Sequence, residues 1–411
     1  MSERRNVVLV TVDSLRADRT GVAGHDESLM PTLDGMAADG LTFTNAIAPG
    51  PATGRSVPAT VTGEYPVRRD AGGSNGTSWG ERVRHHLAVH DTFAERFSRM
   101  GYHTGAFSTN PWVSEHYDFD TGFDEFEDFV ESETDEDGGS LDLRGDSLTG
   151  RLQGHLQDWW SNSDIFLPWE AFYDDVLEWI RTADRPYFLW VFLIDVHMPY
   201  HPPREYRSRS SVAMIPAHLW LLSGSTQRFG SVLSPLLVEA YDDTVSYTDE
   251  FLRRFVEDVG TDPLVVVHGD HGDEFGEHGA YGHGSNLCEE VINVPLVVAN
   301  GPTGYVERPV SLRSMPTLLT ELARGRTPDV SAPYVFTGNP THLAVRGNTW
   351  KYVWRPDGGE LYSLADGSEE PADDDGLRTV AERLVADWHE ARAEKRRIHS
   401  AAERLSQQHR L

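Results

Sequence analysis

The sequence predicts an α/β protein with one large domain and a smaller appendage. Apolar runs of strand length alternate with helical patterns over most of the 411 residues, and a chain of this length can bury a large core. Past residue 300 the pattern changes to short strand-like runs around turns, and then to a terminal helical repeat. We therefore expect a main sheet covered by helices, followed by short antiparallel strands and a final helix.

The first strand is predicted from Asn6 to Val12, because a continuous β-branched run is typical of a central strand buried on both faces. The run ends at Asp13-Ser14, so a carboxylate follows the carboxyl end of the strand. Ligands of open α/β sheets bind outside these strand ends. Asp13 is therefore a candidate ligand; the alternative is that it caps a helical turn in the DSLRAD segment.

The segment from Gly50 to Pro66, GPATGRSVPATVTGEYP, predicts hydroxyl groups at the start of a short helix. Thr53 and Ser56 precede the apolar run, Pro58 is expected in the first helical turn, and the helix is expected to end at Gly63. A hydroxyl at a helix amino terminus is well placed to receive an anionic group. Simple helix capping is the alternative explanation, because Ser and Thr cap many helices.

The segment from Val265 to Leu296 carries the strongest signal of function. A buried strand is predicted to end at Asp270-His271, and His278 and His283 follow in a Gly-rich loop. Neighbouring carboxylate and imidazole groups at a strand end suit a divalent cation. In the alternative interpretation the Asp-His pair caps a strand and the histidines are solvated, but several histidines interleaved with carboxylates and glycines favour a metal site.

Together these segments resemble the sulfatase branch of the alkaline phosphatase superfamily. VLVTVDSLRADRTG is similar to the family's opening strand and metal aspartate, and DHGDEFGEHG to its most specific block. In the expected order lie MPTLDGMAADGLTFTNAIAPGPATGRSVPATVTGEYP, GYHTGAFSTNPWVSEHYDFDTGFDEFED, YFLWVFLIDVHMPYHPP and AVRGNTWKYVW with GGELYSLADG. The resemblance implies an alkaline-phosphatase-like core of a mixed, mostly parallel sheet sandwiched by helices, with a small C-terminal antiparallel strand subdomain and a terminal helix.

The resemblance also implies how the chain is divided. Residues 1-335 would form a sulfatase-like catalytic domain, with an insertion at about 124-180, and residues 336-411 would form the small C-terminal subdomain and terminal helix. Helical spacing predicts that this helix packs through one apolar face, formed by Leu377, Val380, Leu384 and Trp388.

The insertion interrupts the core pattern in two ways. Residues 124-146 hold eleven carboxylates and one basic residue, which predicts an exposed and mobile segment. The next segment is rich in aromatic residues at roughly helical spacing, among them Trp159, Trp160 and Trp169. Such a stripe usually packs in a core; the alternative is a lid that touches the leaving group of a substrate.

The nucleophile position departs from the family's pattern. Sulfatases oxidise a Cys or Ser in C/S-x-P-x-R to formylglycine, and counting back from Thr62-Gly63 places Thr53 at that position. Arg55 replaces the proline of the motif and a valine replaces its arginine, while the only cysteine, Cys288, lies elsewhere. Formylglycine formed from cysteine is therefore excluded on this alignment. Thr53 is instead similar to the unmodified hydroxyl of the superfamily's phosphodiesterases and phosphoglycerol or phosphoethanolamine transferases.

The resemblance implies one divalent cation, either Ca²⁺, Mn²⁺ or Mg²⁺, with Zn²⁺ as a further possibility. Its expected ligands are Asp13, Thr53, Asp270 and His271. A serine, not a second aspartate, follows Asp13, and no clear D-x-x-x-H motif supplies a second metal, although Asp195 and His197 lie near that pattern.

The resemblance and the chemistry that an ester requires assign roles to the remaining candidates. Thr53 would attack a small-molecule sulfate or phosphate ester. His197 and His283 match positions lining the substrate pocket and would donate a proton to the leaving group or neutralise the ester. Arg55 would clamp an anionic oxygen, or else be a surface arginine. His278 would support the ligands, or else only shape the loop.

The sequence therefore predicts a metal-dependent hydrolase of sulfuric or phosphoric esters with a Thr nucleophile. The threonine raises a first alternative, a phosphodiesterase, phosphonate hydrolase or phospho-group transferase of the same superfamily. A second alternative is a catalytically inactive homologue that binds an anion or a partner.

Composition sets the expected environment. With 36 Lys+Arg against 65 Asp+Glu, the net charge of -29 disfavours nucleic acid and anionic membranes as partners. Only Lys351 and Lys395 are lysines, and an acidic, lysine-poor chain is similar to proteins of a high-salt cytoplasm. A single cysteine fits a reducing compartment, and the apolar runs are too short for a signal-peptide core or a bilayer span. We expect a halophilic, cytoplasmic protein without a membrane span.

Overall fold

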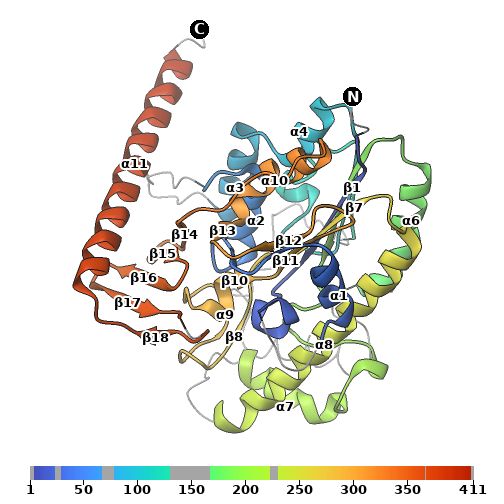
Figure 1. Ribbon diagram of the computed structural model, residues 1–411, viewed down its shortest axis with the longest axis horizontal. Helices are drawn as coiled ribbons and strands as arrows, with labels where there is room; N and C mark the ends of the chain where they lie inside the picture. Colours follow the sequence, from blue (N-terminus) through green and yellow to red (C-terminus); the bar gives the residue numbers. More distant parts are fainter. Residues whose placement is uncertain are drawn as a thin grey trace.

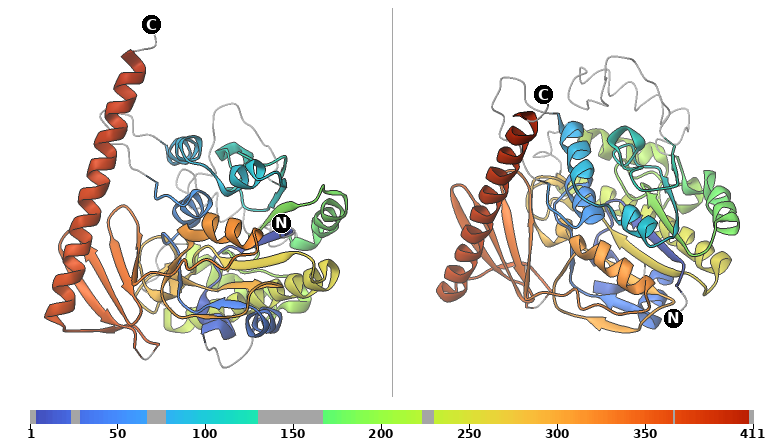
Figure 2. Two further views of the ribbon diagram at one scale, coloured as in Figure 1. Left: turned by 45° about the horizontal axis from the view of Figure 1, so that its top comes forward. Right: turned by 90° about the horizontal axis from the view of Figure 1, so that it is seen from above.

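The computed structural model describes residues 4–23, 29–66, 78–129, 167–222, 230–365 and 367–408. Within these ranges, an eight-stranded sheet carries helices on both faces, and a separate five-stranded sheet with the long helix α11 (Asp375–Gln408) lies along one side of it (Figure 1, Figure 2). The predicted class is confirmed: the main sheet is mixed and mostly parallel, and the small C-terminal sheet is antiparallel.

The central strands of the main sheet are the two that the apolar runs predict, β1 and β7. They pair in parallel, and β6 pairs in parallel with the other side of β1. In spatial order the strands are β12 (Gly304–Val306), β2 (Leu41–Phe43), β11 (Leu296–Ala299), β7 (Leu264–Gly269), β1 (Val7–Val12), β6 (Tyr187–Leu193), β4 (His103–Ser108) and β5 (Glu125–Asp128). The strand β11 runs antiparallel to both of its neighbours.

Alternate residues of β1 face two separate apolar cores. Val8, Val10 and Val12 pack on one side, and Val7 and Leu9 on the other, all fully buried. The first side is covered by α1 (Pro31–Asp39), α6 (Tyr173–Thr182), α7 (Ser211–Leu222) and α8 (Gly230–Val259). The second is covered by α2 (Thr53–Thr62), α3 (Trp79–Val89), α4 (Phe93–Arg99) and α10 (Met315–Ala323). Burial on both faces explains why these strands are continuously apolar.

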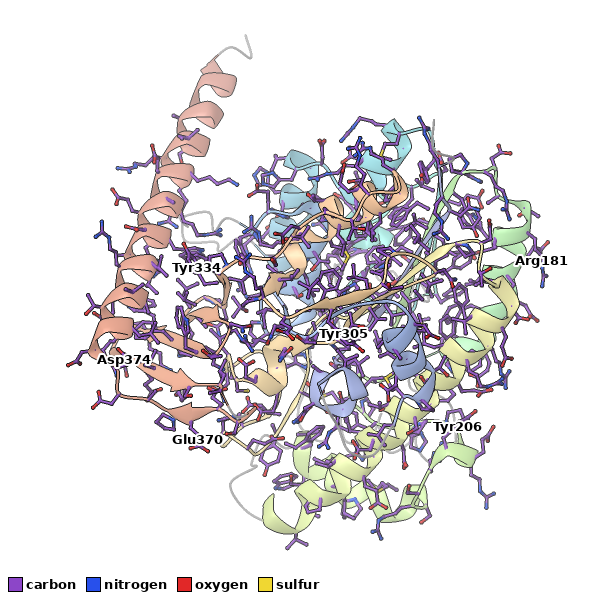
Figure 3. The ribbon with its side chains drawn as sticks, viewed as in Figure 1. Arg181, Tyr206, Tyr305, Tyr334, Glu370 and Asp374 are labelled. Carbon is purple, nitrogen blue, oxygen red and sulfur yellow. The ribbon has the colours of Figure 1, made fainter. Side chains whose placement is uncertain are left out.

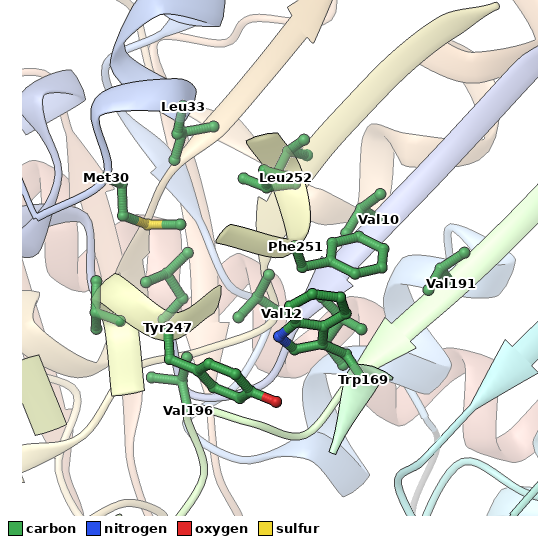
Figure 4. Close-up of a cluster of buried hydrophobic side chains, with 14 of the residues drawn as sticks. Val10, Val12, Met30, Leu33, Trp169, Val191, Val196, Tyr247, Phe251 and Leu252 are labelled. Atoms are coloured by element: carbon green, nitrogen blue, oxygen red, sulfur yellow. The ribbon is translucent and has the colours of Figure 1, made fainter. Parts of the chain in front are cut away.

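The start of the predicted insertion is a strand. Residues 125–128 form the edge strand β5 and pair in parallel with β4, so the prediction of a mobile segment is wrong there, whereas Glu125 and Glu127 are exposed as predicted. Trp169 is fully buried against Tyr247 and Phe251, so it packs in the core as expected (Figure 4). Trp159, Trp160 and residues 130–166 lie outside the described residues.

Short elements join the layers near the carboxyl ends of the central strands. They include β3 (Ala46–Ile47), β10 (Asn293–Val294) and β13 (Val310–Ser311) in a three-stranded sheet, the hairpin of β8 (Glu274–Phe275) and β9 (Tyr281–Gly282), and α9 (Glu289–Ile292). The 3-10 helices are η1 (Ala17–Arg19), η2 (Gly21–Ala23), η3 (Glu115–Tyr117), η4 (Trp169–Ala171), η5 (Arg204–Tyr206) and η6 (Leu312–Ser314).

The C-terminal sheet is an antiparallel meander. It contains β14 (Tyr334–Gly338), β15 (Leu343–Gly347), β16 (Trp350–Arg355), β17 (Gly358–Ser363) and β18 (Glu370–Pro371). The expected domain boundary at 335/336 falls inside β14. One face of the sheet packs on the main body around α9, and the other packs on α11. Figure 3 shows Glu370 and Asp374 at the outer edge of this sheet, where the chain turns into α11.

The terminal helix α11 (Asp375–Gln408) follows its predicted apolar face except at one position. Val380 is 52 % exposed, whereas Ala381 and Val385 are buried against the sheet beside Leu377 and Leu384. The buried residues therefore repeat every four positions along the helix. The sequence prediction placed Val380 on this face and omitted Ala381. The C-terminal part of α11 extends beyond the sheets (Figure 1). Within the described ranges, no helix has the length and apolar character needed to cross a bilayer.

Candidate functional site

The carboxyl ends of three strands bring four polar side chains to one place. Asp13 follows β1, Asp270 and His271 follow β7, and Asn110 follows β4 by two residues. The parallel register of β1 and β7 aligns their last residues, which sets Asp13 beside Asp270. All four side chains are fully buried. The structure thus brings Asp13, Asp270 and His271 to one place, although Asp13 lies far from the other two in the sequence.

Asp13, Asp270 and His271 form a candidate ligand set. The Nε2 atom of His271 lies 3.6 Å from Asp13 Oδ1 and 3.6 Å from Asp270 Oδ2. The Nδ1 atom of His271 lies 3.1 Å from the Gly272 carbonyl oxygen and donates to it, which leaves the Nε2 lone pair facing the carboxylates. Burial lowers the pKa of His271 to about 4, so the imidazole is neutral, as a metal ligand must be.

The electrostatics of these two carboxyl groups favour a cation between them. Burial raises the pKa of Asp13, and the neighbouring Asp270 raises it further. Burial raises the pKa of Asp270 to about 7, and its Oδ2 atom accepts no hydrogen bond from the described residues. Buried carboxylates are normally paired with cations or metals. Two carboxylates and one imidazole therefore fit a divalent ion such as Ca²⁺, Mn²⁺, Mg²⁺ or Zn²⁺.

Thr53 adds a hydroxyl to this set. Its Oγ1 atom lies 3.2 Å from His271 Nε2 and 3.4 Å from Asp13 Oδ2, and the residue is 5 % exposed. Thr53 is the first residue of α2, after Ala52 at the N-cap. The hydroxyl consequently lies at the positive end of a helix and within reach of the candidate ligands.

The start of α2 differs from the expectation in one respect. The helix already begins at Thr53, so Pro58 lies inside it and not in its first turn. Ser56 donates its hydroxyl to the backbone carbonyl of Asp270 at 2.6 Å, which ties the beginning of α2 to the end of β7. Gly63 ends the helix in the left-handed conformation, as predicted.

A second carboxylate–imidazole pair lies next to the first. The Nδ1 atom of His283 is 2.6 Å from Asp273 Oδ1, and the hydroxyl of Tyr200 donates to Asp273 Oδ2 at 2.7 Å. Burial alone would lower the pKa of His283, but the charge of Asp273 raises it to about 9. The ring of His283 lies 4.3 Å from the ring of His271 and 5.3 Å from that of His197, centroid to centroid. A charged imidazolium therefore borders the candidate metal site.

His271, Asp273 and His283 form a competing group whose ligand atoms also lie within 4.8 Å of one another. Both oxygens of Asp273 already accept hydrogen bonds, whereas Asp270 Oδ2 accepts none from the described residues. The ion pair with His283 lowers the pKa of Asp273 to about 2, despite burial, which alone would raise it. The group that contains Asp13 and Asp270 is therefore the better cation site.

The remaining candidates lie elsewhere. The Nε2 atom of His278 is 3.0 Å from Glu290 Oε2, and this hydrogen bond raises the pKa of His278. Arg55 follows Thr53 by two residues, so it leaves α2 on a different side, and it lines a cavity next to the C-terminal subdomain. Burial, followed by the nearby charge of Glu170, raises the pKa of Asp195 to about 7. Among the described residues, no ligand group within coordination reach includes Asp195 or His197.

Sequence reasoning missed Asn110 and Asp273. Asn110 donates its amide to Asp13 Oδ2 at 2.5 Å. Its position just after a strand is the same signal that identified Asp13, so it was available in the sequence. Asp273 lies inside the DHGDEFGEHG block, but nothing local indicates that it pairs with His283 and not with a metal.

Comparisons with known proteins identify the family. Residues 5–304 match the family described as Sulfatase. A sulfatase of Formosa agariphila is 26% identical over 367 residues, which cover 77% of this chain and 69% of that protein. An arylsulfatase of Clostridium perfringens is 24% identical over 365 residues, which cover 76% and 74%. The crystal structure of the phosphonate monoester hydrolase of Agrobacterium radiobacter aligns with a TM-score of 0.67 and 18% identity, covering 95% of this chain and 96% of that one.

The chain belongs to the sulfatase family. The predicted resemblance, the alkaline-phosphatase-like fold and the class of ester hydrolase are therefore confirmed. The halophilic character, the cytoplasmic location, the Thr nucleophile and the single cation stay predictions.

Proposed function

We propose that this protein hydrolyses sulfuric or phosphoric esters with the unmodified hydroxyl of Thr53 as nucleophile. One observation carries the proposal: Thr53 Oγ1 lies 3.2 Å from His271 Nε2, beside two buried carboxylates and at a helix amino terminus. A catalytically inactive homologue would have no need to keep a hydroxyl and three ligand groups converged. The convergence therefore favours an enzyme over an anion-binding or partner-binding protein.

We further propose that one divalent cation is held by Asp13, Asp270, His271 and Thr53. When bound, such a cation would lower the pKa of the Thr53 hydroxyl and neutralise charge on the ester oxygens. Two observations support this assignment: Asp270 Oδ2 has no hydrogen-bond partner among the described residues, and the pKa of Asp13 is raised. A bound cation would contact the Asp270 oxygen and stabilise the charged form of Asp13. Asn110 would keep the Asp13 carboxylate in position through its amide.

The side chains then divide the chemistry between them. Thr53 Oγ1 gives its proton to Asp13 Oδ2, to which it donates at 3.4 Å, and forms a bond to sulfur or phosphorus while the bond to the leaving oxygen breaks. The amino terminus of α2 orients the charged oxygens. His283, held as an imidazolium by Asp273, donates its Nε2 proton to the leaving oxygen. Water then bonds to sulfur or phosphorus and gives one proton to His283, the bond to Thr53 Oγ1 breaks, and Thr53 takes its proton back from Asp13. His197, whose ring is next to that of His283, would contact the ester oxygens.

The identity of the nucleophile bears on whether the substrate is a sulfate or a phosphate ester. Family sulfatases use formylglycine, whereas Thr53 provides a hydroxyl that attacks directly. This feature favours a second candidate function, hydrolysis of a phosphodiester or a phosphonate, or transfer of a phospho group. The substrate in either case is a small-molecule ester.

The test is a panel of aryl esters with the full-length protein at high salt. Release of 4-nitrophenolate would be measured from 4-nitrophenyl sulfate, 4-nitrophenyl phosphate, bis(4-nitrophenyl) phosphate and 4-nitrophenyl phenylphosphonate, with added Mn²⁺ or Ca²⁺. We expect Thr53→Ala to lower turnover by at least about 1000-fold and Thr53→Ser to retain part of it. Intact-mass measurement of the active protein should show an unmodified threonine.

The matched control is Thr60→Ala. Thr60 is a buried threonine of the same helix, and its hydroxyl bonds to the Ser56 carbonyl within α2. We expect the turnover of this variant to stay within a few-fold of the parent, because the Thr60 hydroxyl bonds within α2 and not to Asp13 or His271. Unchanged turnover in Thr53→Ala would remove this residue from the mechanism. A protein that binds the cation but cleaves no ester would support the inactive alternative.

A further inference from the structure

A cavity of about 200 Å³ lies between the start of α2, the β14–β15 turn and α11. It is separate from the candidate ligands of the metal site, and its lining combines guanidinium groups with aromatic rings. The residues that matter for its chemistry are Arg55, Arg392, Arg396, Tyr65, Trp354 and Trp388.

The cavity is positively charged in an otherwise acidic protein. The chain has 65 Asp+Glu against 36 Lys+Arg, yet none of the described residues that line the cavity is a carboxylate. Arg396 makes no hydrogen bond or ion pair with any described residue. Burial, together with the charges of Arg313 and Arg396, lowers the pKa of Arg392 to about 10. Like charges gathered in a partly enclosed space repel one another unless an anion joins them.

Aromatic rings hold one of these guanidinium groups in place. Arg392 lies over the ring of Trp388 at 4.8 Å and over the ring of Tyr65 at 5.6 Å, measured to the ring centroids. Cation–π contacts of this kind orient a guanidinium without neutralising it. His389, which also lines the cavity, has a buried Nε2 atom without a hydrogen-bond partner among the described residues. The lining thus offers charge, ring surface and an unsatisfied polar atom to a ligand.

Two segments that carry candidate active-site residues also line the cavity or bond to its lining. Arg55 lies two residues after Thr53 in α2. Asn339, in the β14–β15 turn, donates its amide to the carbonyl of Ser285 at 2.9 Å, and Ser285 lies two residues after His283. A molecule that occupies this cavity therefore lies close to the segments that carry the proposed nucleophile and acid.

We propose that this cavity is a second anion-binding site, which takes a negatively charged group carried on an aromatic or sugar ring. The guanidinium groups bind the anion and the tryptophan rings pack on its ring. The ligand is either the distal end of the ester substrate or a separate anionic molecule. The first source rests on the proposed function, and the second does not.

Direct binding tests the site without any turnover. The probe is naphthalene-2-sulfonate, whose carbon–sulfur bond is not an ester, titrated into the full-length metal-free protein by isothermal titration calorimetry. We expect Arg396→Gln to weaken binding by at least about 10-fold, because it removes one charge-assisted contact. Arg397→Gln is the matched control, because Arg397 is the next residue of α11 but is exposed and outside the cavity. Absence of binding to the parent protein, or equal binding by the two variants, would overturn the proposal.

A second pair of variants guards against misfolding. Arg392→Lys keeps the charge and is expected to bind the sulfonate more tightly than Arg392→Gln. Circular dichroism would establish that both variants are folded. A result in which the two bind alike, and as tightly as the parent, would exclude a role for this charge and contradict the proposed site.

Kinetics distinguish the two sources of the ligand. If the substrate carries the anionic group, Arg396→Gln should raise the KM of a carboxylated aryl ester at least about 5-fold and leave that of its uncharged analogue unchanged. If neither KM changes while sulfonate binding is weakened, the ligand is a separate anion. If the protein cleaves no ester, the proposed function fails but the calorimetry still decides whether the anion site exists.

Discussion

Lys351 is one of only two lysines in the chain, and it is fully buried where the C-terminal sheet meets the main body. Its Nζ atom donates to the Leu287 carbonyl oxygen at 2.8 Å, lies 3.3 Å from Glu289 and pairs with Glu369. Lys351→Met keeps most of the aliphatic stem and removes the charge. The substitution therefore measures how much this network of ion pairs stabilises the contact between the C-terminal sheet and the main body.

The expected cost follows from what the substitution leaves behind. Removing one member of a buried ion pair typically costs about 3–5 kcal/mol, because the partner charge stays buried. Arg346, 3.1 Å from Glu289, would still neutralise one of the two carboxylates. We therefore expect a loss near the lower end of that range, about 3 kcal/mol in the free energy of unfolding.

The assay is urea unfolding followed by tryptophan fluorescence, at one fixed salt concentration. The other lysine supplies the matched control: Lys395 is 33 % exposed and pairs with Glu64 at 2.9 Å. Lys395→Met should cost no more than about 1 kcal/mol, because an exposed ion pair is screened by solvent. Equal losses in the two variants, or a loss below about 1 kcal/mol for Lys351→Met, would refute the reasoning.

The same network predicts a pH dependence. Burial opposes ionisation of Glu289, but the charges of Lys351 and Arg346 overcome it and lower its pKa. A carboxyl group whose pKa is lowered by folding stabilises the folded state at pH values above the ordinary carboxyl pKa of about 4.3. This stabilisation is lost as the pH falls through the lowered pKa. The stability difference between the parent and Lys351→Met should therefore narrow from neutral to acid pH. A difference that widened on acidification would contradict the assignment.

Three further substitutions test the site and the fold. Asp270→Asn should lower turnover by at least about 1000-fold. The same substitution should raise the melting temperature of the chelator-treated protein, because it removes the buried repulsion with Asp13. A lower melting temperature would count against the buried charge pair. Asn110→Ala should weaken Mn²⁺ binding or turnover by about 10–100-fold, since its amide holds Asp13, and full retention in calorimetry would exclude that role. Gly63→Ala should lower the free energy of unfolding in urea by about 1–2 kcal/mol, because the φ of Gly63 is 83°. Gly35→Ala is the control and should not destabilise the protein, because an added Cβ there meets nothing within 4 Å. Equal effects of the two substitutions would disprove the backbone argument.

Local signals in the sequence were sufficient for the central strands and for the residue types that follow them. The β-branched run before Asp13 and the apolar run before Asp270 predict two buried strands, because only a strand covered on both faces is continuously apolar. Gly63 marks the end of α2, because glycine adopts the left-handed backbone there without the steric cost of a Cβ. These features depend only on residues that are neighbours in the sequence, so they can be predicted without knowledge of the tertiary structure.

Other features depend on contacts between segments that lie far apart in the chain. The register of β1 and β7 brings Asp13 to Asp270, and the packing of loops decides that Asp273 pairs with His283. The direction in which Arg55 leaves α2 depends on where that helix begins, which sequence reasoning placed too late. Arg55 lines the same cavity as residues of α11 because the C-terminal sheet and α11 pack on the main body. Sequence alone determined which residue types end each strand, but the tertiary structure decided which of them meet, because side-chain contacts depend on register, helix phase and packing across the whole fold.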